Sequence, residues 1–68
     1  MADPVFKKIQ LVGTSAESFS DAAAKAIAKA AETVRNISWF EVVEQRGSVA
    51  NGTIQQYQVT VNIGFRVE

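Results

Sequence analysis

The stretch from Phe19 to Val34 carries one continuous apolar stripe, and this stripe limits the folds open to a chain of 68 residues. Apolar residues recur at the i, i+3, i+4, i+7 spacing of an amphipathic helix, and most of them are alanine. The members are Phe19, Ala22, Ala23, Ala26, Ile27, Ala30, Ala31 and Val34. Because alanine side chains are short, the helix must lie very close to its packing partner. One helix covers only one face of a sheet, so the opposite face is left without a helix.

The expected ends of this helix are marked by polar residues. Ser18 is a favoured N-cap, and Asp21 stands three residues later, where a carboxylate suits both the free amides and the helix dipole. Asn36 is the expected C-cap.

One predicted strand precedes this helix in the sequence and two follow it. Val5 to Val12 reads as the first strand, with Gly13-Thr14-Ser15 as the break after it. Trp39 to Val49 and Ile54 to Val67 read as the second and third strands. Asn51-Gly52 between them predicts a tight hairpin, since both central positions of a type I′ turn need positive φ.

The third strand has the clearest alternation, and it orients the sheet. One face carries Tyr57, Val59, Val61, Ile63, Phe65 and Val67. This face should meet the alanine stripe, and Phe40 and Val42 should join it from the second strand. An antiparallel sheet with the third strand in the middle fits the alternating directions of the elements. The sequence thus predicts one α+β domain over residues 1–68, a β-α-β-β unit whose three-stranded antiparallel sheet packs on one helix, with residues 1–4 as a flexible tail.

The composition argues against several classes of function. Seven basic and seven acidic residues cancel, so no basic field for nucleic acid exists. Histidine and cysteine are absent, which removes the usual catalytic bases, nucleophiles and zinc ligands, and we expect neither catalytic nor metal-binding residues. No apolar run is long enough to span a bilayer and no signal peptide is evident, so a cytoplasmic protein without membrane contact is expected. A chain this short without disulfides or metal favours self-association.

The face away from the helix carries the only tryptophan among polar side chains. If the hairpin has no bulge, Trp39, Glu41, Val43 and Gln45 share this face with Gln58. A half-solvated sheet face explains the amides but not a large indole. Three interpretations of Trp39 remain open at this point: subunit-interface packing, packing at a sheet edge, and a platform for a planar ligand.

Arg46 and Arg66 are candidate phosphate ligands, because a guanidinium binds phosphate through paired hydrogen bonds. Taken singly, each is more commonly a solvated arginine on a strand. Strict alternation places Arg46 on the face opposite Trp39 and Arg66 on the same face as Trp39.

Several short motifs, in order and over nearly the whole chain, resemble the dodecin family. They are Leu11-Val12-Gly13-Thr14-Ser15, Trp39-Phe40-Glu41-Val42, Arg46-Gly47, Tyr57-Gln58-Val59 and Gly64-Phe65-Arg66. The resemblance implies a hollow homododecamer with flavin sites across its two-fold axes, where two flavins stack as a pair between tryptophans of neighbouring subunits. It implies a flavin storage and photoprotection protein that is not an enzyme.

The same resemblance assigns cofactor-binding roles to individual residues. Trp39 would stack on the flavin ring, Gln58 would bind its polar edge, and Arg46 would pair with the phosphate of flavin mononucleotide (FMN). A bulge at Gly47, or a site built from several subunits, would then be needed to bring Arg46 to the Trp39 side. Arg66 is the second candidate for the phosphate and for coenzyme A, a possible second ligand. Riboflavin or FAD could take the place of FMN.

Two other functions remain open from the sequence. A flavin reductase would oxidise NADH with bound flavin, although no nicotinamide-binding fingerprint is present. A structural or coenzyme-A-binding shell would hold flavin only incidentally.

Overall fold

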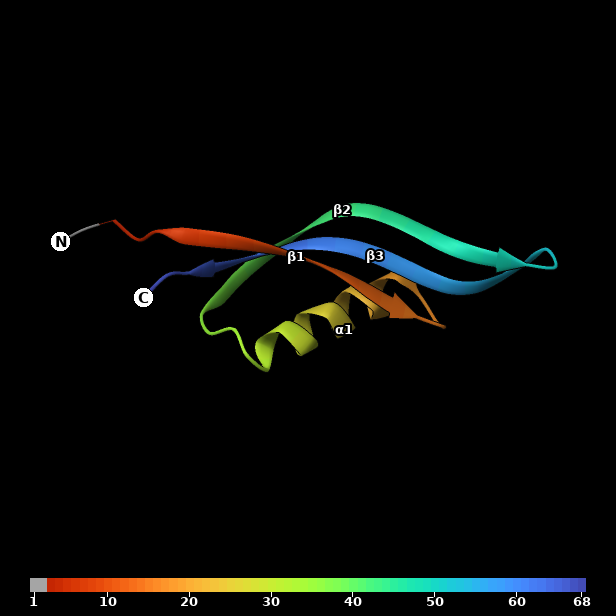
Figure 1. Cartoon of the computed structure of the whole chain (residues 1–68), viewed down its shortest axis with the longest axis horizontal. Coiled ribbons are helices and arrows are strands. Elements are labelled where there is room, and N and C mark those ends of the chain that lie inside the picture. The colour runs from red at the N-terminus through yellow and green to blue at the C-terminus, as the bar shows by residue number, and fades with distance from the viewer. Residues whose placement is uncertain (1–2) are drawn as a thin grey trace.

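Four elements follow one another along the chain in the computed structural model, which describes residues 3–68. They are β1 (Phe6–Ser15), α1 (Phe19–Ala31), β2 (Ile37–Ala50) and β3 (Thr53–Arg66). The strands form an antiparallel sheet in the order β1-β3-β2, and α1 lies against one face of it (Figure 1). The predicted β-α-β-β fold with a central third strand is confirmed. Of the expected flexible tail, residues 1–2 lie outside the described residues, and Asp3 and Pro4 have no regular structure.

The start of α1 follows the prediction. The Ser18 hydroxyl accepts a hydrogen bond from the Asp21 amide at 3.0 Å, as an N-cap does. The Ser15 hydroxyl donates to the Asp21 carboxylate at 2.6 Å, and Lys25 lies 3.0 Å from the same carboxylate oxygen. These two contacts, the Ser15 hydrogen bond first, hold the pKa of Asp21 below its usual range. A short polar network thus joins the end of β1 to the first turn of α1.

The end of α1 differs from the prediction. The helix stops at Ala31 and its C-cap is Glu32, so the assignment of Asn36 as the C-cap was wrong. The Ala30 carbonyl accepts the backbone amide of Val34 at 2.9 Å, and this turn closes the helix early. Asn36 instead has a φ of 65° in the connection to β2, where asparagine tolerates the left-handed region.

The buried core consists of small helix residues against branched residues of β3. Its members are Ala22, Ala26, Ala30, Val59, Val61 and Ile63. Close approach of the helix is most evident at Gly13, where a Cβ would overlap the Ala22 carbonyl oxygen. Gly13 pairs with Val59 inside β1, and the strand continues to Ser15, so the predicted break at residues 13–15 was wrong. The glycine makes room for the helix without ending the strand.

The helix covers β1 and β3 but leaves β2 uncovered. An α-helix with its side chains is about 10–12 Å wide, and strands lie about 4.8 Å apart, so one helix spans little more than two strands. Phe40 and Val42 face the helix side as predicted, yet they remain 50% and 47% exposed. The expectation that they pack under the alanine stripe was therefore wrong.

The β2–β3 hairpin makes the molecule long and thin. Asn51 and Gly52 have φ of 54° and 73°, which confirms the predicted turn. The principal extents are 58 × 20 × 13 Å, and the hairpin projects beyond α1 on the side away from both termini (Figure 1). Within residues 3–68 no helix combines the length and the apolar character needed to cross a membrane.

Candidate functional site

A β-bulge in β2 determines which side chains share the uncovered face of the sheet. Val42 pairs with Val61 and Glu44 with Thr60, so Val43 is an extra residue without a partner in the ladder. Side chains alternate between faces along a strand, and one extra residue reverses the alternation beyond it.

The bulge corrects two predictions about this strand. Arg46, predicted to lie opposite Trp39, lies on the same face as Trp39, directly across from Gln58. The bulge that brings it there is at Val43 and not at Gly47. Gln45, expected on that face, instead pairs with Val59 and lies on the helix side. The shared face of Trp39 and Gln58 is confirmed.

The Trp39 face is the name used below for the side of the sheet opposite α1. It includes Phe6, Lys8, Gln10, Trp39, Glu41, Glu44, Arg46, Gln58, Thr60, Asn62, Gly64 and Arg66.

The indole of Trp39 lies on bare backbone. Its ladder partner is Gly64, and a Cβ at that position would overlap Cε2 and Cζ2 of the ring. The ring of Phe6 meets the indole edge-on, with centroids 5.2 Å apart and planes at 65°. Trp39 remains 37% exposed. The ring is therefore supported from the sheet side and accessible from outside.

The ionised carboxylate of Glu41 fixes the orientation of the Trp39 ring. Nε1 of Trp39 donates to Oε2 of Glu41 at 3.0 Å, and Nζ of Lys8 lies 3.2 Å from Oε1 of the same carboxylate. The indole hydrogen bond first, and the Lys8 hydrogen bond second, hold the pKa of Glu41 below its usual range. Glu41 is thus charged near neutral pH and orients the tryptophan.

A second polar cluster surrounds Arg46. Nε of Arg46 donates to Oε1 of Gln58 at 2.6 Å, and Nη1 lies 3.1 Å from Oε1 of Glu44. Gln58 in turn donates to Gln56 at 2.8 Å. This cluster offers an amide and a guanidinium that already have partners within the chain.

These two clusters lie at opposite ends of the Trp39 face. Gly64, the partner of Trp39, and Gln58 are six residues apart on β3, which corresponds to roughly 20 Å at the usual rise of a strand. Arg66 pairs with Phe6 and lies at the Trp39 end, far from Arg46. Within one chain the four candidate residues therefore form two pairs. A single fused-ring ligand that contacts both Trp39 and Gln58 of the same chain would have to cover most of this distance.

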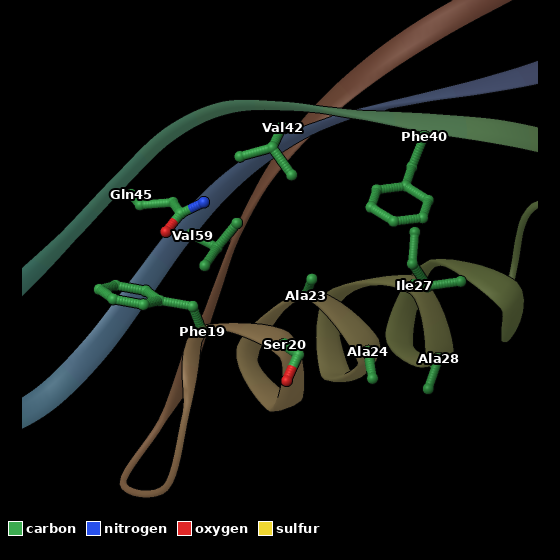
Figure 2. Close-up of a pocket in the computed structure, with 10 residues that line it drawn as sticks. All are labelled: Phe19, Ser20, Ala23, Ala24, Ile27, Ala28, Phe40, Val42, Gln45 and Val59. Atoms are coloured by element: carbon green, nitrogen blue, oxygen red, sulfur yellow. The ribbon is translucent and has the colours of Figure 1, made fainter.

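On the other side of the sheet, an apolar groove of about 690 Å³ separates α1 from β2. Figure 2 shows Phe19 and Ile27 of the helix and Phe40 and Val42 of the strand directed toward this space. Its lining includes no titratable side chain. The groove therefore offers apolar contact area but no titratable group for catalysis.

The Trp39 face offers stacking, hydrogen bonding and positive charge. The chain has neither histidine nor cysteine. Within residues 3–68 no three potential metal ligands come together. The arrangement suits the binding of a planar ligand with a polar edge and an anionic group.

Three contributors to the site escaped the sequence analysis: Phe6, Glu41 as the indole partner, and Gly64. The bulge did leave a signal, because the polar residues Glu44, Arg46 and Ser48 follow the adjacent apolar pair Val42-Val43. Two apolar neighbours interrupt the alternation at the position where the ladder shifts. The pairing of Gly64 with Trp39 did leave a signal, because a regular ladder counted from the predicted Asn51-Gly52 turn, with Ala50 opposite Thr53, places Trp39 opposite Gly64.

Comparison with known proteins gives a consistent result. The family described as Dodecin matches residues 5–68. A dodecin of Thermus thermophilus is 45% identical over 64 residues, covering 94% of this chain and 93% of that protein. A calcium dodecin of Mycobacterium tuberculosis is 32% identical over 63 residues, covering 93% and 89%.

Solved structures agree with this match. The dodecin from Streptomyces coelicolor superposes with a TM-score of 0.94 at 34% identity, covering 100% of this chain and 97% of that one. Structures of the Thermus thermophilus dodecin include three variants, in which a tryptophan is replaced by phenylalanine or one of two arginines by alanine. Each has 42% identity to this chain and a TM-score of 0.92 or 0.93, and the match covers 97% of this chain and 97% or 98% of the variant. Family match, identity and fold lead to one conclusion: this chain belongs to the dodecin family.

Proposed function

We propose that this chain binds FMN as stacked pairs between the Trp39 side chains of neighbouring subunits in a hollow homododecamer. In this proposal the protein stores the flavin and protects it from light, and it catalyses no reaction. The observation that carries the proposal is the bulge at Val43, which puts Arg46 on the uncovered face that also carries Trp39 and Gln58.

The family supports the general part of this proposal. Flavin binding is general among dodecins, which are small binding and storage proteins and form oligomers. A dodecameric assembly is known for this fold. The uncovered strand β2, with Phe40 and Val42 half exposed, agrees with burial against other subunits.

Trp39 suits the stacking role because its ring is held before any ligand arrives. A side chain already fixed by Gly64, Phe6 and Glu41 loses little conformational freedom on binding. Contact between an indole and an excited flavin ring allows electron transfer to the flavin and rapid return, which removes the excitation. Photoprotection follows from that contact.

The separation of the two clusters supports a site shared between subunits. Gln58 and Arg46 of one subunit would meet Trp39 of another, with Gln58 at the polar edge of the ring and Arg46 at the phosphate. Arg66, at the Trp39 end, would be a second cation for the phosphate, or a ligand for coenzyme A. Riboflavin would keep the stacking and lose the charge contact.

The Thermus thermophilus variants add a match of spacing. In that protein the replaced tryptophan precedes the two replaced arginines by seven and by twenty-seven positions. Trp39 precedes Arg46 and Arg66 by the same intervals in this chain. The three residue types proposed here therefore recur at the same spacing in a relative where they were chosen for replacement.

Titration of purified protein with FMN tests the proposal. Flavin emission should fall almost to zero up to one FMN per chain, while light scattering shows the mass of a dodecamer. Emission that stays undiminished at saturating protein would overturn the stacked site. Oxidation of NADH by the loaded protein would favour the flavin reductase instead.

A further inference from the structure

We infer that Gly64 is a positioning residue for flavin stacking, because its lack of a side chain sets the height of the Trp39 ring above the sheet. The inference rests on the proposed flavin site and adds a residue that makes no contact with the ligand itself.

The geometry at this ladder pair is specific to the ring. A Cβ on Gly64 would overlap Cε2 and Cζ2 of Trp39 and would lie 2.6 Å from Cδ2. These atoms belong to the benzene half of the indole, so the side chain and not the strand backbone fills the space. The indole takes the place that a side chain at residue 64 would otherwise occupy.

The backbone itself does not require glycine at this position. Among the described residues Gly52 is the glycine with positive φ, and Gly64 has ordinary strand geometry. An alanine could adopt the Gly64 conformation without strain. The requirement for glycine at residue 64 therefore comes from the tryptophan ring.

A methyl group here would displace a ring held on two other sides. Carbon atoms prefer contacts of about 3.5–4 Å, so the indole would move outward by at least about 1 Å. That shift works against the edge contact with Phe6 and the hydrogen bond from Nε1 to Glu41. In a site between two copies of Trp39, both rings would move, and the space for the stacked flavins would narrow from both sides.

The experiment compares Gly64→Ala in two backgrounds, the natural chain and Trp39→Ala. With Trp39 present, Gly64→Ala should weaken FMN binding at least tenfold and leave measurable emission from bound FMN at saturation. It should also lower the Tm of the ligand-free protein. In the Trp39→Ala background the same substitution should leave Tm within about 1 °C, because the overlapping ring is gone.

Each outcome decides the inference. Equal losses of Tm in both backgrounds would show that the sheet itself, and not the tryptophan ring, requires glycine at residue 64, and this would overturn the inference. Unchanged FMN affinity and quenching in Gly64→Ala would overturn it as well. If Gly64→Ala fails to assemble, assembly of the double variant supports the inference and its failure overturns it. Failure of the natural protein to quench FMN would reject the proposed function and, with it, the role of Gly64 in flavin stacking, whereas the ligand-free Tm comparison still tests the contact between ring and backbone.

Discussion

The two ends of the Trp39 face hold their functional side chains in different ways. At one end, the indole of Trp39 rests on the backbone of Gly64, touches Phe6 and donates to Glu41. At the other end, Arg46 is about half exposed and already paired with Glu44 and Gln58. The first end is packed, and the second is a network of exchangeable polar contacts.

For the proposed FMN site, this difference predicts how the free energy of binding is distributed. A ring that is already in place gives its full stacking energy to a ligand. A guanidinium engaged by Glu44 must exchange a carboxylate for a phosphate, and it gains only the difference between the two. Stacking should therefore dominate affinity, and Arg46 should mainly select phosphorylated flavins. Four measurements test this comparison.

Removing the stacking ring should have the largest effect. Trp39→Ala should weaken FMN binding by about 2 kcal/mol or more, which is roughly thirtyfold, because a buried aromatic anchor is lost. Isothermal titration calorimetry gives the Kd. Trp39→Phe is the matched control, and it should retain part of the affinity. A loss below threefold in Trp39→Ala would show that stacking is not the main contribution.

Removing the guanidinium should have a smaller and selective effect. Arg46→Ala should weaken FMN binding by about 1–2 kcal/mol, because the variant loses a charge-assisted hydrogen bond to the phosphate, less the contact with Glu44 that Arg46 gives up on binding. Riboflavin, which has no phosphate, should bind as before. The ratio of the two Kd values is the measurement. Arg66→Ala, measured in the same way, reports on the second candidate cation at the other end, and equal losses for both ligands in Arg46→Ala would contradict a phosphate contact at Arg46.

Releasing Arg46 from its internal partner should improve FMN binding slightly. Glu44→Gln removes the charge 3.1 Å from Nη1, and an exposed ion pair of this kind is worth about 0.2–1 kcal/mol. FMN affinity should rise up to about fivefold with riboflavin affinity unchanged. A decrease in FMN affinity would mean that Glu44 orients Arg46 for binding and does not compete with the phosphate.

Acid should release the indole at the Trp39 end, with the smallest effect of the four. Since the pKa of Glu41 is lowered by Trp39 and Lys8, its contribution is present above the ordinary glutamate range and is lost as pH falls through the lowered value. Tryptophan emission of the ligand-free protein should therefore shift only below that range. Light scattering checks that the assembly stays intact. Glu41→Gln, whose amide oxygen still accepts from the indole, should show no such shift.

Much of the fold could be predicted from the sequence because local signals agreed with one another. The alanine stripe, the Ser18 cap and the Asn51-Gly52 turn each specify a local conformation, and the alternation of β3 specifies its two faces. The helix end was misjudged because asparagine suits a left-handed position in a loop as well as at a helix C-cap, and Asn36 lies in the connection to β2. Gly13 was misjudged because its glycine serves helix packing and not a turn.

The candidate site was less predictable, since it depends on register. The pairing of Trp39 with Gly64 is the one a regular hairpin gives, because the shift between Ser48 and Val49 and the bulge at Val43 offset each other. Arg46 lies between these two irregularities, so its pairing with Gln58 departs from the regular register. A strand pattern read residue by residue assumes that neither exists. The sequence could identify the residue types of the site but not their arrangement.

The bulge at Val43 also has an evolutionary consequence. Because one unpaired residue separates the two halves of β2, the loss of a single codon there would put Arg46 and Trp39 on opposite faces of the sheet. No substitution at Arg46 is needed for such a change. Insertion and deletion in this strand would thus alter the charge presented to a ligand in one step, and relatives are best compared by register and not by residue identity alone.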